Sequence, residues 1–176
     1  ARALGHHAEG RAGFMRRRKQ SGPVERNDDG SFTLNLGEHE QQVILSFVDQ
    51  LRQLVTGDVD DPRVRRLFPV AYAQDDEAET EYRRFMREEL VTSRVAAIDQ
   101  VTSFLSTQEP ITAAQLNGLM MTVNGLRLVM GTLLDVTDDG SEPEFDDEDD
   151  PLAAQWQLYG WLGWFLEWIV DAQSPE

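Results

Sequence analysis

The sequence predicts a mostly α-helical, single-domain bundle with an N-terminal β-hairpin. Its 176 residues are 40% hydrophobic, which suits one domain with a substantial core. Apolar residues recur at spacings of three and four along several long segments, the periodicity of amphipathic helices. Capping residues or proline stand at the start of most of these segments. Together these patterns predict four long helices and one short helix.

The hairpin is predicted at residues 24–36. An Asn-Asp-Asp-Gly turn at 27–30 separates two short segments of strand-forming residues. Apolar side chains alternate along the second segment, at Phe32, Leu34 and Leu36. The alternation gives the hairpin one buried face, and Gly37 ends the strand.

The first two helices follow the hairpin. Apolar residues predict an amphipathic helix from about residue 38 to 56, with Gly57 as its stop. Asp61-Pro62 then combines an N-cap with a proline at the first helical position, and so predicts a short helix that Pro69 ends.

Three further patterns predict the remaining helices. One helix runs from about 76 to 105, and its apolar stripe consists of Tyr82, Phe85, Met86, Leu90, Ala97, Ile98, Val101, Phe104 and Leu105. The capping box of Thr112 and Gln115 opens a helix that reaches about 135 and is apolar around most of its circumference, so we expect it at the centre. Asp150-Pro151 opens the last helix, which is rich in aromatic residues.

Charged residues are distributed unevenly along the chain. The net charge is −16, but residues 1–26 carry +5 and the remainder −21. We expect residues 1–22 to be a flexible basic arm and 23–173 a single helical domain with an acidic loop at 138–150. Nine of the 13 loop residues are acidic, which is typical of a solvated linker or of a docking surface for a basic partner. Their spacing does not match an EF-hand calcium loop.

No catalytic, cofactor-binding or metal-ligating residues are predicted. The chain has no cysteine, which excludes thiolate chemistry and disulfides. Its histidines, at positions 6, 7 and 39, form no recognisable catalytic constellation, and no P-loop, dinucleotide-binding or zinc-protease motif occurs. We find no signal peptide and no membrane span, so the protein is expected in the cytoplasm.

The aromatic helix supplies the candidate partner-binding residues. They are Trp156, Tyr159, Trp164 and Trp168. These side chains offer either core packing or an exposed stripe for a protein partner or a second copy of the chain, and both readings remain open. Arg127 lies on the nearly all-apolar central helix, so we expect it to pair with a carboxylate as a structural polar residue.

The basic arm is the one region that favours phosphate. Its cluster consists of Arg16, Arg17, Arg18 and Lys19. Either it binds nucleic acid weakly, or it neutralises the acidic body. No helix-turn-helix with a basic recognition face is evident, so we expect no DNA binding beyond this arm.

Three segments carry a family resemblance. They are Arg65-Arg66-Leu67-Phe68-Pro69-Val70-Ala71-Tyr72, Asn124-Gly125-Leu126-Arg127-Leu128-Val129-Met130-Gly131 and Leu158-Tyr159-Gly160-Trp161-Leu162-Gly163-Trp164. In this order they resemble the AosR-like actinobacterial family, also labelled a domain of unknown function and often encoded beside the ClpS adaptor. The resemblance runs from Met15 to about Ala172.

The resemblance implies an oxidative-stress-responsive regulator that works with the transcription machinery. We therefore expect a non-enzymatic regulatory protein that acts through protein contacts. The alternative is an adaptor or assembly protein linked to Clp-type proteolysis, without a role in transcription. Because the chain lacks cysteine, thiol oxidation cannot be its sensing chemistry.

Overall fold

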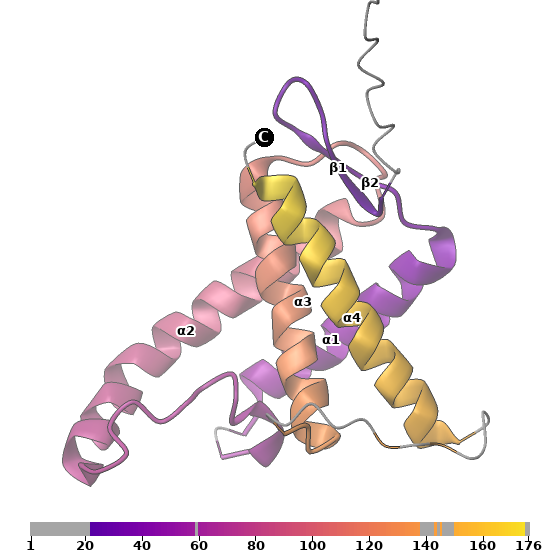
Figure 1. The fold of residues 1–176 in the computed structure, drawn as a ribbon. Helices are drawn as coiled ribbons and strands as arrows, with labels where there is room; N and C mark the ends of the chain where they lie inside the picture. Colours follow the sequence, from indigo (N-terminus) through magenta and orange to yellow (C-terminus); the bar gives the residue numbers. More distant parts are fainter. Residues whose placement is uncertain (1–21, 59, 138–142, 144, 146–149, 175–176) are drawn as a thin grey trace, which may run out of the picture.

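Helix α3 (Ala113–Leu133) lies at the centre of the protein, and every other helix packs on it (Figure 1). The structure is a computed structural model that describes residues 22–58, 60–137, 143, 145 and 150–174. Over these residues it confirms the predicted class, a helical bundle with a small N-terminal hairpin. The central place of α3 follows from its composition, because a helix that is apolar on nearly every side must be covered on nearly every side.

The other three long helices are α1 (Glu38–Thr56), α2 (Asp76–Phe104) and α4 (Pro151–Gln173). The first two match their predicted bounds to within a residue, and α4 begins at its predicted start. Local hydrogen bonds explain the agreement. The Asp75 carboxylate accepts the Ala78 N–H at 3.0 Å, and the Asp150 carboxylate accepts the Leu152 N–H at 2.8 Å. These caps satisfy amide groups that would otherwise have no partner, so each helix begins where its cap stands.

The short helix is shorter than the sequence suggests. Element η1 is a single 3-10 turn, Pro62–Val64, rather than a helix that continues to Pro69. The chain turns after Val64, whose carbonyl accepts the N–H groups of both Leu67 and Phe68. Val64 and Leu67 are both buried at this bend.

The hairpin consists of β1 (Val24–Arg26) and β2 (Phe32–Leu34), paired antiparallel with Val24 opposite Leu34. Phe32 also exchanges two backbone hydrogen bonds of 2.8 Å with Ile111, the residue before the α3 cap. The sequence analysis did not anticipate this link. It fixes the hairpin to the start of the central helix and places it beside the C-terminal end of α4 (Figure 1).

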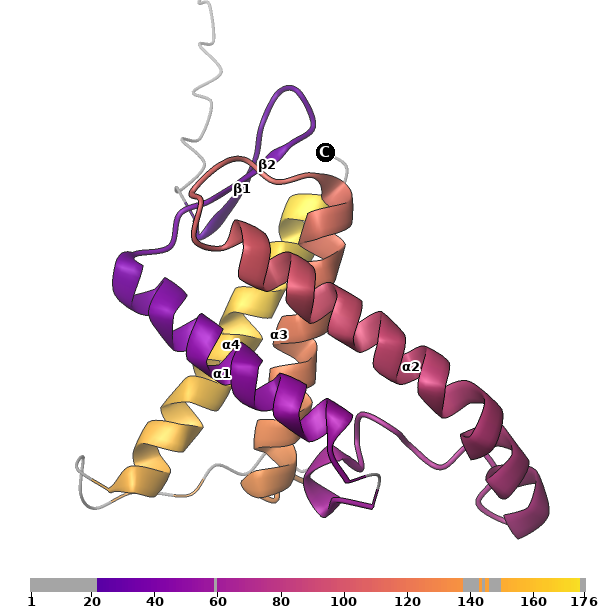
Figure 2. The same cartoon turned by 180° about the vertical axis from the view of Figure 1, so that it is seen from behind.

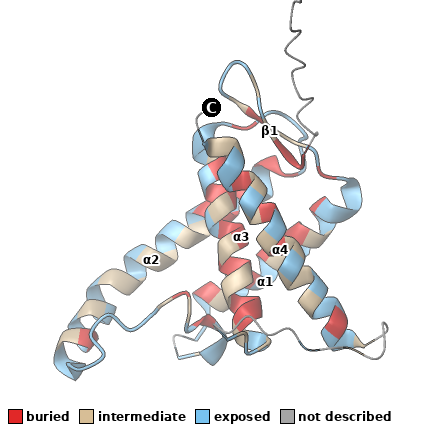
Figure 3. Ribbon diagram, in the orientation of Figure 1, coloured by how far each residue is buried: buried red, intermediate tan, exposed pale blue. Residues whose placement is uncertain are grey.

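Burial follows the inner faces of the helices and most of α3, as Figure 3 shows. The first half of α2 is the exception. It projects away from the body (Figure 2), and Phe85, which the predicted apolar stripe includes, is 69% exposed. The stripe is therefore wrong at this position. Phe85 lies on a side of α2 that is open to water, whereas Phe68 and Tyr72 pack against Arg87 and Tyr82 on the same half of the helix.

Two predicted segments fall largely outside the described residues: the arm at 1–21 and most of the acidic loop at 138–149. Gly22, which the analysis placed at the end of the arm, is instead buried against α4. None of the described helices is both long and apolar enough to cross a lipid bilayer.

Candidate partner-binding site

The three segments that carry the family resemblance meet around the second half of α3. Arg66, from the first segment, donates a hydrogen bond of 2.7 Å to the Val136 carbonyl just beyond α3. Arg127, from the second, lies with its guanidinium 4.7 Å from the ring centre of Tyr159, which belongs to the third. Arg66 and Tyr159, which are more than 90 positions apart in the sequence, both lie beside Gly131, so the three segments form one contiguous region.

Arg127 has no carboxylate partner among the described residues, so that expectation is wrong. Its guanidinium instead faces the π surface of Tyr159, and its Nε is buried without a hydrogen bond. A Cβ added at Gly163 would lie 3.3 Å from this Nε. The glycine thus gives the arginine room on α4, while the aromatic ring supplies the electrostatic attraction that a carboxylate was expected to supply.

The four aromatic candidates on α4 divide into two pairs. Trp168 is half-buried, and its ring covers Gly22, where any added Cβ would lie within 2.2 Å of it. Trp164 packs edge-to-face on Trp168 with ring centres 6.2 Å apart, yet it remains 46% exposed. Trp168 therefore holds the start of the hairpin to α4, and Trp164 presents an aromatic surface to solvent.

The second pair lies nearer the start of α4. Tyr159 is half-buried over Arg127, and Trp156 packs edge-to-face on Tyr159 at 5.9 Å. Each of the four side chains thus has a ring or cation neighbour within the protein. Of the four, Trp164 is the exposed side chain, and the other three are partly buried.

The helices α1 and α4 diverge along the second half of α3 (Figure 2). An apolar groove lies between them, on another side of α4. Its volume is about 540 Å³. Its lining residues are Phe47, Gln50, Leu51, Leu54, Arg63, Leu126, Val129, Met130, Leu133, Ala154, Gln155, Leu158 and Leu162. Leu133, one of the apolar residues of α3, lines this groove and is 53% exposed.

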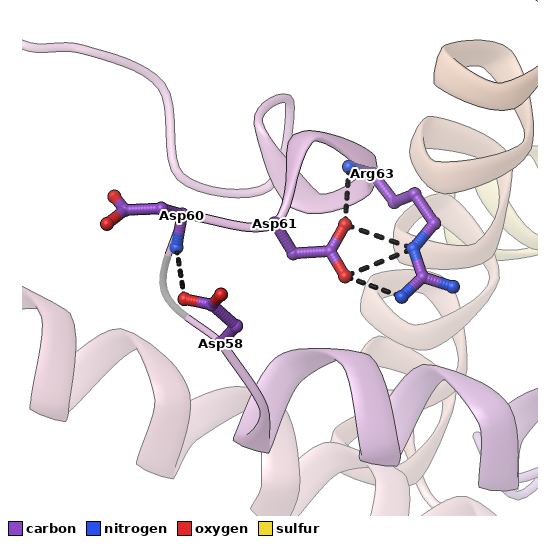
Figure 4. Close-up of polar contacts among 4 residues, drawn as sticks. All are labelled: Asp58, Asp60, Asp61 and Arg63. Carbon is purple, nitrogen blue, oxygen red and sulfur yellow. Dashed lines mark hydrogen bonds and ion pairs between the residues drawn. The ribbon is translucent and has the colours of Figure 1, made fainter.

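A second hollow of about 360 Å³ shares Gln50, Leu54 and Arg63 with the groove. Its other lining residues include Asp58 and Asp61, from the segment that joins α1 to η1. Figure 4 shows that Asp61 holds the Arg63 guanidinium with contacts of 2.6–3.1 Å and also accepts the Arg63 N–H. The positive charge of Arg63 is therefore neutralised within the wall of the hollow.

These contacts keep Asp61 ionised. The hydrogen bonds from the Arg63 side chain, then from its backbone N–H, lower the pKa of Asp61 below its ordinary value. The carboxylate of Asp58 accepts only the Asp60 N–H, at 3.0 Å, among the described residues, and Asp60 itself is exposed (Figure 4). The hollow is thus an acidic extension of the apolar groove, with acceptor oxygens on Asp58 available to a ligand.

Sequence reasoning missed the groove and the hollow. The groove arises because α1 and α4 diverge, and helix periodicity does not record the angle between two helices. The acidic hollow had a weak signal in the cluster Asp58, Asp60 and Asp61, which the analysis used only for a helix cap.

The described residues show no cluster of potential metal ligands. No group of three or more histidine, aspartate or glutamate side chains among them is placed to hold a metal ion. His39 is exposed in the first turn of α1, while His6 and His7 lie outside the described residues.

Comparison with known proteins supports the resemblance. A family model described as "Domain of unknown function (DUF2017)" matches residues 16–173. A curated protein of Mycobacterium leprae (strain TN), named "Putative oxidative stress regulator AosR", is 26% identical over 156 residues. That alignment covers 78% of this chain and 71% of the relative. No solved structure matches the chain.

Proposed function

The chain belongs to this DUF2017 family, and we propose that it is a non-enzymatic regulatory protein that acts by binding another protein. The name of the M. leprae relative supports a regulatory role in the response to oxidative stress. We place its partner within the transcription machinery and confine any contact with nucleic acid to the basic cluster at residues 16–19.

The main observation in support of protein binding is the exposed indole of Trp164. Tryptophan is a large apolar side chain that a protein exposes at a cost and that frequently dominates the binding energy of an interface. Trp164 lies against Trp168, which is itself fixed over Gly22, so the indole is held by its neighbour rather than free to move. A rigid exposed aromatic side chain loses little conformational entropy on binding.

Affinity capture tests this proposal. The full chain, Trp164→Ala and Phe85→Ala are used as baits in an actinobacterial lysate under matched conditions. Phe85 is the control, since it is more exposed than Trp164 but lies on the projecting half of α2. We expect a sigma factor or RNA polymerase with the full chain and with Phe85→Ala. Capture should fall by roughly tenfold or more with Trp164→Ala, the range for an interface tryptophan.

Two outcomes would contradict parts of this proposal. Equal capture by all three baits would remove Trp164 from the interface. Capture of a Clp protease component in place of transcription proteins would favour the alternative, an adaptor linked to proteolysis.

A further inference from the structure

We infer that the apolar groove between α1, α3 and α4 binds a basic amphipathic helix of a partner protein. This inference deepens the proposed function, on which it rests for the premise that a protein partner exists. It concerns a surface separate from Trp164, because that residue does not line the groove.

The first step is the apolar wall. Leu126, Val129 and Met130 form the floor from α3, with Phe47 and Leu54 on the α1 side and Leu158 on the α4 side. Leu133 stands at the end of this floor with more than half of its surface in water. Burying such side chains is favourable because it removes apolar surface from water. The groove therefore favours a ligand that presents a row of apolar side chains.

The second step is the form of the ligand's backbone. The groove has helical walls, and no strand of the described structure borders it, so its walls offer no row of backbone groups for pairing. A peptide in an apolar groove must satisfy its own N–H and C=O groups. A helix does this internally and presents apolar side chains at spacings of three and four, the helix-in-groove mode of recognition.

The third step is charge. The groove continues past Gln50 and Leu54 into the hollow that contains Asp58 and Asp61. The cation of this wall, Arg63, is already paired with Asp61, which leaves Asp58 without a charged partner among the described residues. Lysine or arginine on the flank of the ligand helix would meet this carboxylate. An acidic helix would be repelled.

The same charge argument disfavours a second copy of this chain as the occupant. The helices α1 and α4 both carry a net negative charge. In α1 the acidic residues Glu38, Glu40 and Asp49 outnumber the single arginine, Arg52. In α4 the charged residues are Glu167 and Asp171, both acidic. Placing either helix beside Asp58 brings like charges together, which opposes binding.

A fluorescein-labelled, 18-residue peptide of leucine and lysine tests the inference, with leucine at helical spacing along one face. The peptide is titrated with the full chain at about 150 mM salt and read by fluorescence anisotropy. Two further peptides serve as controls. One has the same composition in an order without an apolar face, and the other has glutamate in place of lysine. We expect saturable one-to-one binding of the first peptide only.

Matched variants locate the site. Leu133→Arg should weaken binding by about tenfold or more, whereas Leu152→Arg should change it less than about twofold. Leu152 is the control because it is a leucine of similar exposure, 43%, outside the groove. Asp58→Asn should weaken binding by about threefold, and Asp28→Asn, an exposed aspartate in the hairpin turn, should leave it unchanged.

Several results would overturn the inference: no binding of the basic peptide, equal binding of the reordered or acidic peptide, or equal effects of Leu133→Arg and Leu152→Arg. Sedimentation that shows a dimer dissociated by Leu133→Arg would assign the groove to a second copy instead. Circular dichroism checks that each variant folds. If Leu133→Arg does not fold, the comparison of Asp58→Asn with Asp28→Asn still tests the inference. Failure of lysate capture would leave these peptide results unaffected.

Discussion

The two halves of α2 show how one continuous helix serves two different purposes. In the second half, Ala97, Ile98, Val101 and Phe104 are buried against the bundle. In the first half, Glu79 is the only buried residue, and the helix projects from the body (Figures 1 and 2). Apolar packing on α3 fixes the second half, so a different set of interactions must order the first.

Those interactions are polar and aromatic. The Glu79 carboxylate accepts the N–H groups of Ala71 and Tyr72, both at 2.9 Å, and the Arg83 Nε at 2.7 Å. Farther along, Arg94 donates to the Leu67 carbonyl at 2.9 Å and lies over the Phe68 ring. The segment before α2 therefore folds back along its own helix. The comparison shows that local capping sets the length of α2, whereas the elements packed beside each half determine how far its side chains are buried.

The largest expected effect is in the buried half. Ile98→Ala removes a fully buried side chain from the contact with α3, so the free energy of unfolding should fall by about 2–5 kcal/mol. Urea denaturation followed by circular dichroism measures this change. A loss below about 1 kcal/mol would mean that this half of α2 is not packed as described.

An intermediate effect is expected at the polar contact. Glu79→Gln keeps the shape of the side chain but removes its charge, so the hydrogen bonds to Ala71 and Tyr72 weaken. Hydrogen exchange of these two amides should become several-fold faster, while exchange in the second half of α2 stays unchanged. Uniform acceleration along α2 would show instead that the two halves unfold together.

The same contact predicts a pH dependence. The N–H of Tyr72 first, then the Arg83 side chain, lowers the pKa of Glu79 below its ordinary value of 4.5. A carboxylate with a lowered pKa stabilises the folded state above its unfolded pKa, and this contribution is lost as pH falls through the folded pKa. Protection of the Ala71 and Tyr72 amides should therefore decrease below about pH 4.5 in the natural chain but not in Glu79→Gln.

The smallest effect is expected at Phe85. Phe85→Ala removes a larger side chain than Ile98→Ala does, but one that is mostly in water, so the free energy of unfolding should change by no more than about 0.5 kcal/mol. The same urea titration measures both variants. A loss comparable to that of Ile98→Ala would place the projecting half against another part of the protein.

The sequence alone determined where the four long helices lie and where each of them begins. The caps formed by Thr112 with Gln115 and by Asp150 with Pro151 act through hydrogen bonds or backbone geometry within a few residues, so their effect can be predicted without the fold. The all-apolar circumference likewise placed α3 at the centre. The candidate site could be predicted from the sequence only in part. The aromatic residues of α4 were identified, but the sequence does not show which of them pack inside the protein.

Only the tertiary structure decided what each side chain meets. Phe85 and Leu133 belong to apolar periodic patterns yet are exposed. No described element covers the side of α2 that carries Phe85, and α1 and α4 diverge beside the end of α3. Arg127 faces Tyr159 rather than a carboxylate because α4 brings an aromatic ring and a glycine alongside it. Periodicity reports which side of a helix is apolar, whereas burial depends on the crossing angles and lengths of its neighbours, which are set by the packing of the whole chain.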